Sequence, residues 1–290
     1  MNILVTGSNG QLGSEIKDVS ASYKSFRFFF MDLPALDICN SSQLDLFIAK
    51  NKIHTVINCA AYTAVDAAEE NAVIAEQING VGVLNLVHAL TKVNGKLIHI
   101  STDYVFDGNV FLPYQESDKT NPIGVYGKTK RNGELAVING DIDGIVIRTS
   151  WLYSAYGTNF VKTMQRLGKE RNELNVIYDQ LGTPTNASDL AKTCLDILAY
   201  SKETNINAKG NVYHYSNEGV ASWYDFAKAI MELGEIDCEV RPIETKDYPT
   251  AAKRPHFSVL NKAKIKNDFE IEIPYWRDSL AQCISKLNQE

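Results

Sequence analysis

The chain of 290 residues is 44% hydrophobic and 22% charged, an ordinary globular composition with ample material for a buried core. Its formal net charge of -6, without a basic block, argues against a nucleic-acid partner, and no apolar run approaches the ~20 residues that span a bilayer. Five scattered cysteines without a C-x-x-C pair are typical of reduced thiols in a cytoplasm, and because a strand begins directly after Met1 we expect no signal peptide.

The N-terminal segment combines a strand, a glycine-rich turn and a helix. Residues 2–6 predict a short apolar strand, and a helix is expected from Ser14. Between them, Gly7, Gly10 and Gly13 form a G-x-x-G-x-x-G pattern. Glycines permit a tight turn and close approach of the backbone to a pyrophosphate, and the helix N-terminus supplies N–H donors. The combination predicts a dinucleotide site and makes a purely structural glycine turn the weaker interpretation.

A second apolar strand is expected at 25–31 and ends at Asp32. An acidic residue about 20 positions after the glycines is placed to accept hydrogen bonds from the adenosine ribose hydroxyls. This favours NADH over NADPH, whose 2′-phosphate a carboxylate would repel, while a helix or turn cap is the alternative role. Asp37 and Ile38 follow and are expected to flank the adenine, before a helix at 41–51.

Strands and helices continue to alternate along the next hundred residues. Strands are expected at 54–59, 96–100 and 144–149, separated by helical segments at 65–93, with a break near Asn71, and at 126–139. This alternation is typical of a parallel, doubly wound sheet, whose ligands bind at the carboxyl ends of the strands. The segment expected to lie along the cofactor there contains small residues and comprises Ala60, Ala61, Tyr62 and Thr63.

The chemistry of the chain is expected around a tyrosine and a lysine four positions apart. On a helix, Tyr126 and Lys130 project from one face. A lysine cation beside a tyrosine stabilises the phenolate and lowers the pKa of the phenol from its usual ~10 toward neutral pH. Thr102, at a strand end, offers a hydroxyl to the same volume. The trio suits proton delivery to a carbonyl oxygen as hydride reaches its carbon, although a solvated helix face would show the same spacing.

The second half of the chain is less regular, without an internal repeat or a low-complexity linker. Ser188 and Asp189 are expected to cap one helix, and Ser222 another. We predict a dinucleotide-binding domain at 1–150 and a smaller α/β lobe at 151–290, packed on the first with chain crossings between them. Further elements are expected at 159–169, 175–178, 189–200, 211–215, 223–233 and 275–287.

Several sequence blocks together resemble the extended short-chain dehydrogenase/reductases, which implies a Rossmann-type doubly wound sheet with a smaller C-terminal substrate-binding lobe. The later blocks are similar to those of the dTDP-4-dehydrorhamnose reductase family, and the resemblance covers nearly the full length. The blocks are GSNGQLG at 7–13, NCAAYT at 58–63, STDYVFDG at 101–108, YGKTK at 126–130 with Gly133 and Glu134, RTSWLY at 148–153, GTNF at 157–160, DQLGTPT at 179–185 and RPHFSVL at 254–260.

This resemblance implies reduction of the C4 ketone of dTDP-4-dehydro-L-rhamnose by NADH or NADPH, since members of the family commonly accept both. Tyr126 would donate the proton, Lys130 would hold the nicotinamide ribose and tune Tyr126, and Thr102 would hydrogen-bond the carbonyl. The expected cofactor contacts are Gly7, Gly10, Gln11, Leu12, Gly13, Asp32, Asp37, Ile38, Ala60, Ala61, Tyr62, Thr63, Tyr126 and Lys130. The expected substrate contacts are Thr102, Asp103, Tyr104, Trp151 and Arg254.

Four of the residues singled out keep two interpretations. Trp151 is expected to stack on the substrate, with core packing as the alternative. Arg254 is expected either to bind the substrate diphosphate with its guanidinium fork or to pair with a surface acid. Some members of the family form homodimers around a magnesium ion held by acidic residues. Glu15 matches one such position and Asp189 is expected near another, but ordinary solvated carboxylates would look the same.

Two other functions remain open at this point. A reductase or epimerase of another sugar nucleotide would share all the cofactor residues, and a panel of substrates would separate it. A non-catalytic regulatory subunit would retain dinucleotide binding without turnover. The intact trio of Thr102, Tyr126 and Lys130 favours an enzyme.

Overall fold

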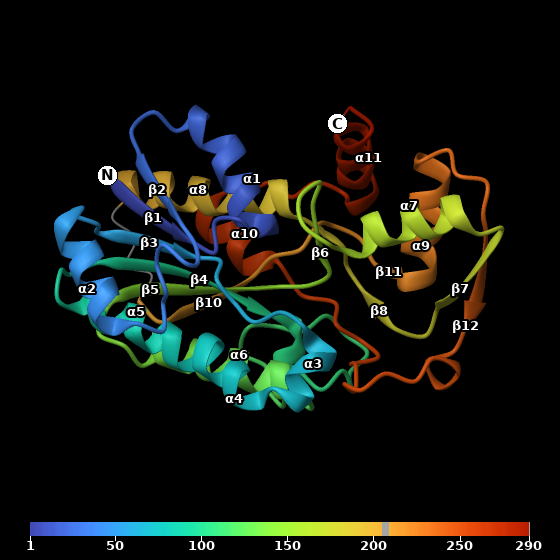
Figure 1. Cartoon of the computed structure of the whole chain (residues 1–290), viewed down its shortest axis with the longest axis horizontal. Coiled ribbons are helices and arrows are strands. Elements are labelled where there is room, and N and C mark those ends of the chain that lie inside the picture. Colours follow the sequence, from blue (N-terminus) through green and yellow to red (C-terminus); the bar gives the residue numbers. More distant parts are fainter. Residues whose placement is uncertain (205–208, 290) are drawn as a thin grey trace.

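The structure is a computed structural model that describes residues 1–204 and 209–289, and it has a large lobe around one sheet with a smaller lobe beside it (Figure 1). Within these residues the sheet has six strands, all paired in parallel, in the order β10-β5-β4-β3-β1-β2. The chain switches direction between β1 and β3, which is where open α/β sheets bind ligands. The strands are β1 (Asn2–Thr6), β2 (Arg27–Met31), β3 (Thr55–Asn58), β4 (Lys96–Thr102), β5 (Asp143–Thr149) and β10 (Asn211–His214).

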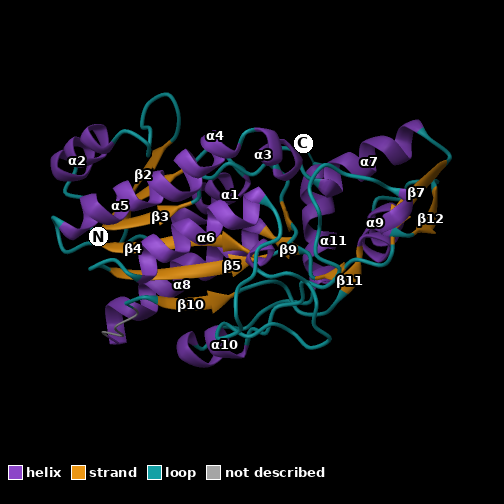
Figure 2. Ribbon diagram, turned by 90° about the horizontal axis from the view of Figure 1, so that it is seen from below, coloured by secondary structure: helices purple, strands orange, loops and turns teal. Residues whose placement is uncertain are grey.

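Helices cover both faces of this sheet, as the expected doubly wound arrangement requires (Figures 1 and 2). On one face lie α1 (Gln11–Val19), α8 (Ala187–Thr204) and α10 (Ala263–Phe269), packed over a core that includes Ile3, Val5 and Leu190. The other face carries α2 (Ser41–Lys50), α5 (Gly82–Thr91) and α6 (Val125–Ile138) over a second core. The strands are apolar on both sides because both faces are buried.

The helical segment expected at 65–93 is divided. It consists of α3 (Val65–Glu70), α4 (Ala72–Glu76), one π-helical turn (Gln77–Val81) and α5, so the break predicted near Asn71 is confirmed. The π-helical turn was not anticipated. Contrary to expectation, residues 72–91 are long and apolar enough to cross a membrane by length and composition, but 50% of the stretch is buried within the protein, as in a core helix.

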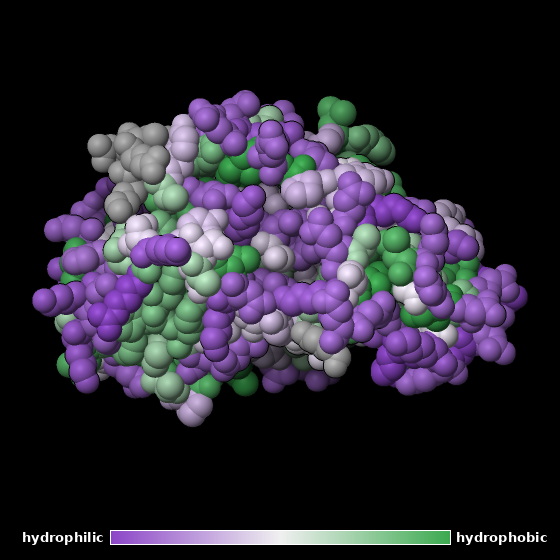
Figure 3. All heavy atoms as spheres, turned by 90° about the horizontal axis from the view of Figure 1, so that it is seen from above, coloured by the Kyte–Doolittle hydropathy of each residue, from purple (hydrophilic) through white to green (hydrophobic). Residues whose placement is uncertain are grey.

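The smaller lobe has its own core around Phe226, Ile230 and Leu280. On the surface, Figure 3 shows hydrophobic areas on both lobes within a mostly hydrophilic face. The short strands of the smaller lobe pair two by two, and its last helix, α11, lies beside α9. These elements are β6 (Leu152–Tyr153) with β9 (Thr185–Asn186), β7 (Glu173–Ile177) with β12 (Glu239–Ile243), β8 (Leu181–Gly182) with β11 (Ala221–Ser222), α7 (Phe160–Glu170), α9 (Trp223–Leu233) and α11 (Trp276–Leu287). Short 3-10 turns occupy Ser20–Ser22, Asp103–Val105 and Thr245–Asp247.

Several expected boundaries differ from the structure. Helix α1 begins at Gln11 and not at Ser14, because the turn after Gly7 closes within three residues. Helix α8 begins at Ala187, and the Asn186 side chain, not Ser188, accepts a backbone N–H at its start. Strand β12 was not predicted at all. The expected cap at Ser222 is confirmed and forms a capping box with Asp225.

The expected chain crossings between the lobes are extensive. Strand β10 pairs with β5 at the edge of the large sheet, and α8 packs against α1, although both follow residue 150. The chain therefore enters the smaller lobe after β5 and returns to the large lobe twice, first for α8 and β10 and then for α10, before α11 packs in the smaller lobe. This path brings loops from both lobes to the carboxyl ends of the strands.

Candidate active site

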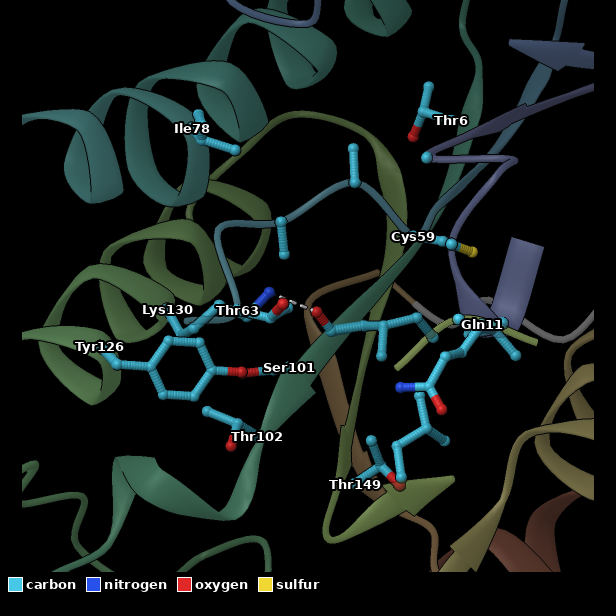
Figure 4. A pocket seen from close by; sticks show the side chains of 18 of the residues that line it. Thr6, Gln11, Cys59, Thr63, Ile78, Ser101, Thr102, Tyr126, Lys130 and Thr149 are labelled. Carbon is cyan, nitrogen blue, oxygen red and sulfur yellow. Dashed lines mark hydrogen bonds between the residues drawn. The ribbon is translucent and has the colours of Figure 1, made fainter. Parts of the chain in front are cut away.

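A pocket of about 650 Å³ opens at the carboxyl ends of β1, β3, β4 and β5 and reaches the smaller lobe. Figure 4 shows Tyr126 and Lys130 on one side of it and Gln11 on another. The expected cofactor residues that line it are Gly7, Gly10, Gln11, Leu12, Asp32, Asp37, Ile38, Ala60, Ala61, Thr63, Tyr126 and Lys130. The expected substrate residues that line it are Thr102, Asp103, Tyr104 and Trp151.

The remaining two cofactor candidates, Gly13 and Tyr62, do not line the pocket but lie in the segments that form its wall. A Cβ on Gly13 would lie 2.5 Å from the carbonyl oxygen of Gly7, so glycine lets the first turn of α1 pack on the loop. The backbone of Tyr62 is held by Asn79, whose side chain accepts from Tyr62 N–H at 2.9 Å and donates to its carbonyl at 3.1 Å. Asn79 also donates to the Thr129 hydroxyl at 3.1 Å and so links this loop to α6.

At the far end of the pocket, Asp32 supports the glycine loop as well as facing the cavity. Its Oδ2 accepts the backbone N–H of Asn9 at 2.9 Å, and its Oδ1 accepts that of Leu33 at 2.8 Å. The turn-capping role and the ribose-binding role are therefore compatible, since each oxygen of a carboxylate has more than one lone pair. Asp37 lies nearby and accepts the N–H of Cys39 at 2.8 Å.

The tyrosine and lysine project from α6 into the pocket, beside the end of β4. Lys130 is 2% exposed, and its ammonium donates to the carbonyl of Ile100 at 2.6 Å. Burial lowers the pKa of Lys130 to about 8. Burial raises the pKa of Tyr126 to about 12, although a hydrogen bond with Thr102 opposes this rise. The expected lowering of the pKa by the lysine cation is not found, because desolvation of the phenol dominates and the nearby Asp103 carboxylate adds to the rise.

The raised pKa of Tyr126 suits a proton donor. A phenol with a raised pKa keeps its proton at neutral pH until a reacting oxygen takes it. Thr102 lies at the end of β4 and is 5% exposed. The three side chains therefore meet in one buried volume, as the sequence predicted.

Arg254 takes the second of its two expected roles. Its Nη2 lies 2.7 Å from Asp66 Oδ2, and its Nη1 donates to Asp66 Oδ1 at 3.1 Å. The backbone N–H of Ala252 donates to the same carboxylate at 3.0 Å. Arg254 thus joins a loop of the second half of the chain to α3 and does not line the pocket.

Trp151 is stacked, and its partner is a residue that the sequence reasoning missed. The indoles of Trp151 and Trp223 lie 3.7 Å apart between ring centroids, at 11° to each other, and both line the pocket. Trp151 has a φ of 48°, which is unfavourable for a bulky side chain and requires support from its surroundings. The sequence feature that could have indicated Trp223 is its position directly after the Ser222 cap, because the start of α9 lies at the pocket.

Glu15 and Asp189 do not fit the expected magnesium site, because their carboxylates are engaged within the chain. Glu15 is 2% exposed, accepts the Ser154 hydroxyl at 2.6 Å and pairs with Lys286 at 3.1 Å. Asp189 accepts from Asn217 at 2.7 Å and from Ser279. Among residues 1–204 and 209–289, no group of three or more His, Cys, Asp and Glu could hold a metal ion.

A buried ion pair between Glu134 and Arg148 lies beside β4 and was not predicted from the sequence. Glu134 on α6 accepts from Arg148 Nε and Nη2, both at 2.8 Å, and from the Ser101 hydroxyl at 2.6 Å. Arg131 adds a contact at 2.6 Å. Both Glu134 and Arg148 fall within the sequence blocks that carry the family resemblance, but neither block indicated that the two side chains meet.

Comparison with known proteins places this geometry in a family. The sequence profile of the RmlD substrate binding domain family matches residues 1–289. A dTDP-4-dehydrorhamnose reductase of Aggregatibacter actinomycetemcomitans is 39% identical over 285 residues, which are 96% of each chain. The crystal structure of a dTDP-4-dehydrorhamnose reductase from Clostridium acetobutylicum matches with a TM-score of 0.92 and 42% identity, over 99% of this chain and 100% of that one. A Bacillus anthracis dTDP-4-dehydrorhamnose reductase, solved in complex with NADP, matches with a TM-score of 0.92 and 36% identity, over 98% and 99%.

Proposed function

The chain belongs to the RmlD substrate binding domain family, and we propose that it reduces the C4 ketone of dTDP-4-dehydro-L-rhamnose to dTDP-L-rhamnose with NADH or NADPH. The observation that carries the proposal is the convergence of Thr102, Tyr126 and Lys130 in a buried pocket that also contains the glycine-rich loop. A bound nicotinamide would supply the hydride. The chain itself would then hold the sugar, exclude water and deliver a proton to the ketone oxygen.

Each residue has a proposed part in this reaction. Tyr126 donates its phenolic proton to the C4 oxygen, and Thr102, which hydrogen-bonds Tyr126 beside that oxygen, supports the transfer. Lys130 holds the nicotinamide ribose and presents a positive charge that favours the transient phenolate. The paired indoles of Trp151 and Trp223 form the wall for the sugar at the smaller lobe.

The test of the proposed function is absorbance of the reduced nicotinamide after mixing the protein with dTDP-4-dehydro-L-rhamnose. Rapid loss of absorbance with that substrate, and slow or no loss with other 4-keto sugar nucleotides, is the expected result. Turnover of a different sugar nucleotide would favour the alternative reductase or epimerase. Binding of the dinucleotide without turnover of any sugar would favour a regulatory subunit.

The cofactor is NADH or NADPH, and we propose that NADH is preferred. The residues lining the pocket within the described chain include two carboxylates at the adenosine end, from Asp32 and Asp37, and one cation, from Lys130 at the opposite end. A 2′-phosphate would therefore meet negative charge without a compensating arginine. The Bacillus anthracis relative was solved with NADP, so both cofactors need to be measured side by side.

Replacing Asp32 with asparagine is expected to shift the ratio of kcat/KM for NADPH over NADH upward by about tenfold, because one charge-assisted hydrogen bond contributes about 1.5–3 kcal/mol. Using the ratio cancels any general damage to the glycine loop. Asp45→Asn is the matched control, since Asp45 pairs with Lys92 on the surface of α2 and should leave the ratio unchanged. An unchanged ratio in Asp32→Asn would remove Asp32 from cofactor discrimination.

Removal of divalent metal ions is expected to leave turnover and the melting temperature unchanged. The physical reason is that the carboxylate of Glu15 is already neutralised by the ammonium of Lys286 and that of Asp189 is held by two hydrogen-bond donors. The measurement is initial rate and Tm with excess EDTA and again after adding Mg²⁺. Loss of activity that Mg²⁺ restores would contradict this prediction and revive a metal-linked homodimer.

A further inference from the structure

The carboxyl group of Asp103 is buried at the substrate side of the pocket with one oxygen unused. Asp103 is 2% exposed and lines the pocket directly after β4. Its Oδ1 accepts the hydroxyl of Thr102 at 3.0 Å, whereas its Oδ2 has no hydrogen-bond partner among the described residues. The nearby Ser258 hydroxyl donates to the carbonyl of Leu181, at 3.5 Å. Since a buried polar atom without a partner is costly, Oδ2 is placed to receive a donor from a ligand.

The hydroxyl of Thr102 has a single proton, and its direction matters. The backbone N–H of Tyr104 donates to Thr102 Oγ1 at 3.1 Å, which occupies one lone pair. An ionised carboxylate accepts only, so the bond between Thr102 and Asp103 requires the Thr102 proton to point at Asp103. In that state Thr102 offers Tyr126 only an acceptor.

Proton transfer from Tyr126 needs the opposite arrangement. To protonate a ketone, Tyr126 must direct its O–H at the substrate, and a donor to the phenolic oxygen then stabilises the phenolate that remains. Thr102 can be that donor only when Asp103 attracts the Thr102 hydroxyl proton less strongly. A hydroxyl donated to Oδ2 would take up part of the carboxylate charge and so weaken the bond from Thr102 to Oδ1.

We propose that Asp103 is a positioning residue that couples recognition of the sugar hydroxyl next to the ketone to the direction of the Thr102 proton. The inference rests on the proposed function and adds a specificity device to it. A substrate with the vicinal hydroxyl switches Thr102 from acceptor to donor at Tyr126, and a substrate without it leaves Thr102 turned toward Asp103. Binding energy at one hydroxyl is thereby used to raise kcat and not only to lower KM.

Protonation of Asp103 should mimic this hydroxyl. Burial raises the pKa of Asp103 to about 6, while the neighbouring hydroxyls of Ser258 and Thr102 oppose the rise. Above that pH the carboxyl is ionised and accepts the Thr102 proton, and below it the neutral carboxyl releases Thr102. The ionisable groups that face it are Tyr104 from the turn after β4 and Tyr126 from α6, and both stay neutral in this range because burial raises the pKa of each.

A double-mutant cycle tests the coupling through the Thr102 hydroxyl. We would measure kcat and KM for the wild type, Asp103→Asn, Thr102→Val and the double variant, with cofactor binding and Tm as checks on the fold. The neutral amide of Asp103→Asn accepts the Thr102 proton only weakly, so this variant is expected to keep kcat for the full substrate and to raise kcat about tenfold for an analogue that lacks the vicinal hydroxyl. Adding Asp103→Asn to Thr102→Val should change neither kcat, since interacting residues are non-additive. Equal changes in both backgrounds would overturn the proposal, because Asp103 would then act on the substrate alone.

Two further measurements make the test specific. With the wild type, a substrate analogue that lacks the vicinal hydroxyl should show a low kcat at neutral pH that recovers as the pH falls through about 6. With Asp103→Asn, the same analogue should show the higher kcat throughout this range. Full kcat of the wild type with this analogue at neutral pH would also overturn the proposal. Asp107→Asn is the matched control, because Asp107 is bonded to Asn121 and Tyr114 outside the pocket and should leave kcat unchanged. Turnover by the wild type tests the proposed function separately, since the coupling is read only from ratios between variants.

Discussion

Tyr126→Phe is expected to lower kcat by about 10²–10⁴-fold, the range over which a positioned general acid contributes, while the protein stays folded. The substitution removes the hydroxyl and leaves the ring, which stacks edge-on against Tyr104 with centroids 5.6 Å apart. The remaining rate would come from hydride positioning and from water as the proton source. The measurement is steady-state oxidation of NADH or NADPH with the 4-keto sugar nucleotide at saturation.

The control for Tyr126 is a second tyrosine-to-phenylalanine change. Tyr178 is 45% exposed, lies outside the pocket, and should tolerate the change without loss of kcat. Dissociation constants for the cofactor should be similar in all three proteins, because the phenolic hydroxyl is directed at the end of β4 (Figure 4). A Tyr126→Phe protein that keeps kcat within about threefold of the wild type would exclude Tyr126 as the proton donor, since that is far below the expected effect of general acid catalysis.

The large lobe was predictable because its signals are local. The G-x-x-G-x-x-G loop lies between a strand and a helix, and the spacing of Tyr126 and Lys130 puts both on one face of α6. Alternation of strands and helices then leaves few topologies, and a parallel sheet brings all the strand ends to one edge. Position at that edge is therefore readable from the sequence.

The features that were missed depend on contacts between distant segments. Trp223 meets Trp151 across 72 positions of the chain, and Arg254 pairs with Asp66 across 188. Nothing local to Arg254 indicates that an acid on α3 will meet it. The pKa of Tyr126 was predicted to fall because a lysine cation was near in sequence, but burial, which only the fold reveals, raises it. The π-helical turn likewise requires knowledge of what Asn79 must reach.

Glu134→Gln is expected to cost about 3–5 kcal/mol in the free energy of unfolding, the range for breaking one partner of a buried ion pair. Glu134 is 0% exposed and Arg148 is 2% exposed, so the guanidinium left behind would be a buried charge without its carboxylate. Although burial alone would raise the pKa of Glu134, the hydrogen bond and charge of Arg148 lower it overall. Because the folded-state pKa is depressed, this stabilisation is present at neutral pH and is lost as the pH falls through the folded-state value.

Glu170→Gln is the matched control for this loss. Glu170 also pairs with an arginine, Arg166 at 2.9 Å, but the two side chains are 52% and 60% exposed. Such a pair contributes about 0.3–0.5 kcal/mol, so the control should unfold in urea almost as the wild type does. If Glu134→Gln also unfolded like the wild type, the buried pair would stabilise the folded protein no more than an exposed pair does. If it lost stability as expected, kcat should fall as well, because Glu134 holds the Ser101 hydroxyl and Ser101 precedes Thr102 on the strand that carries the reaction.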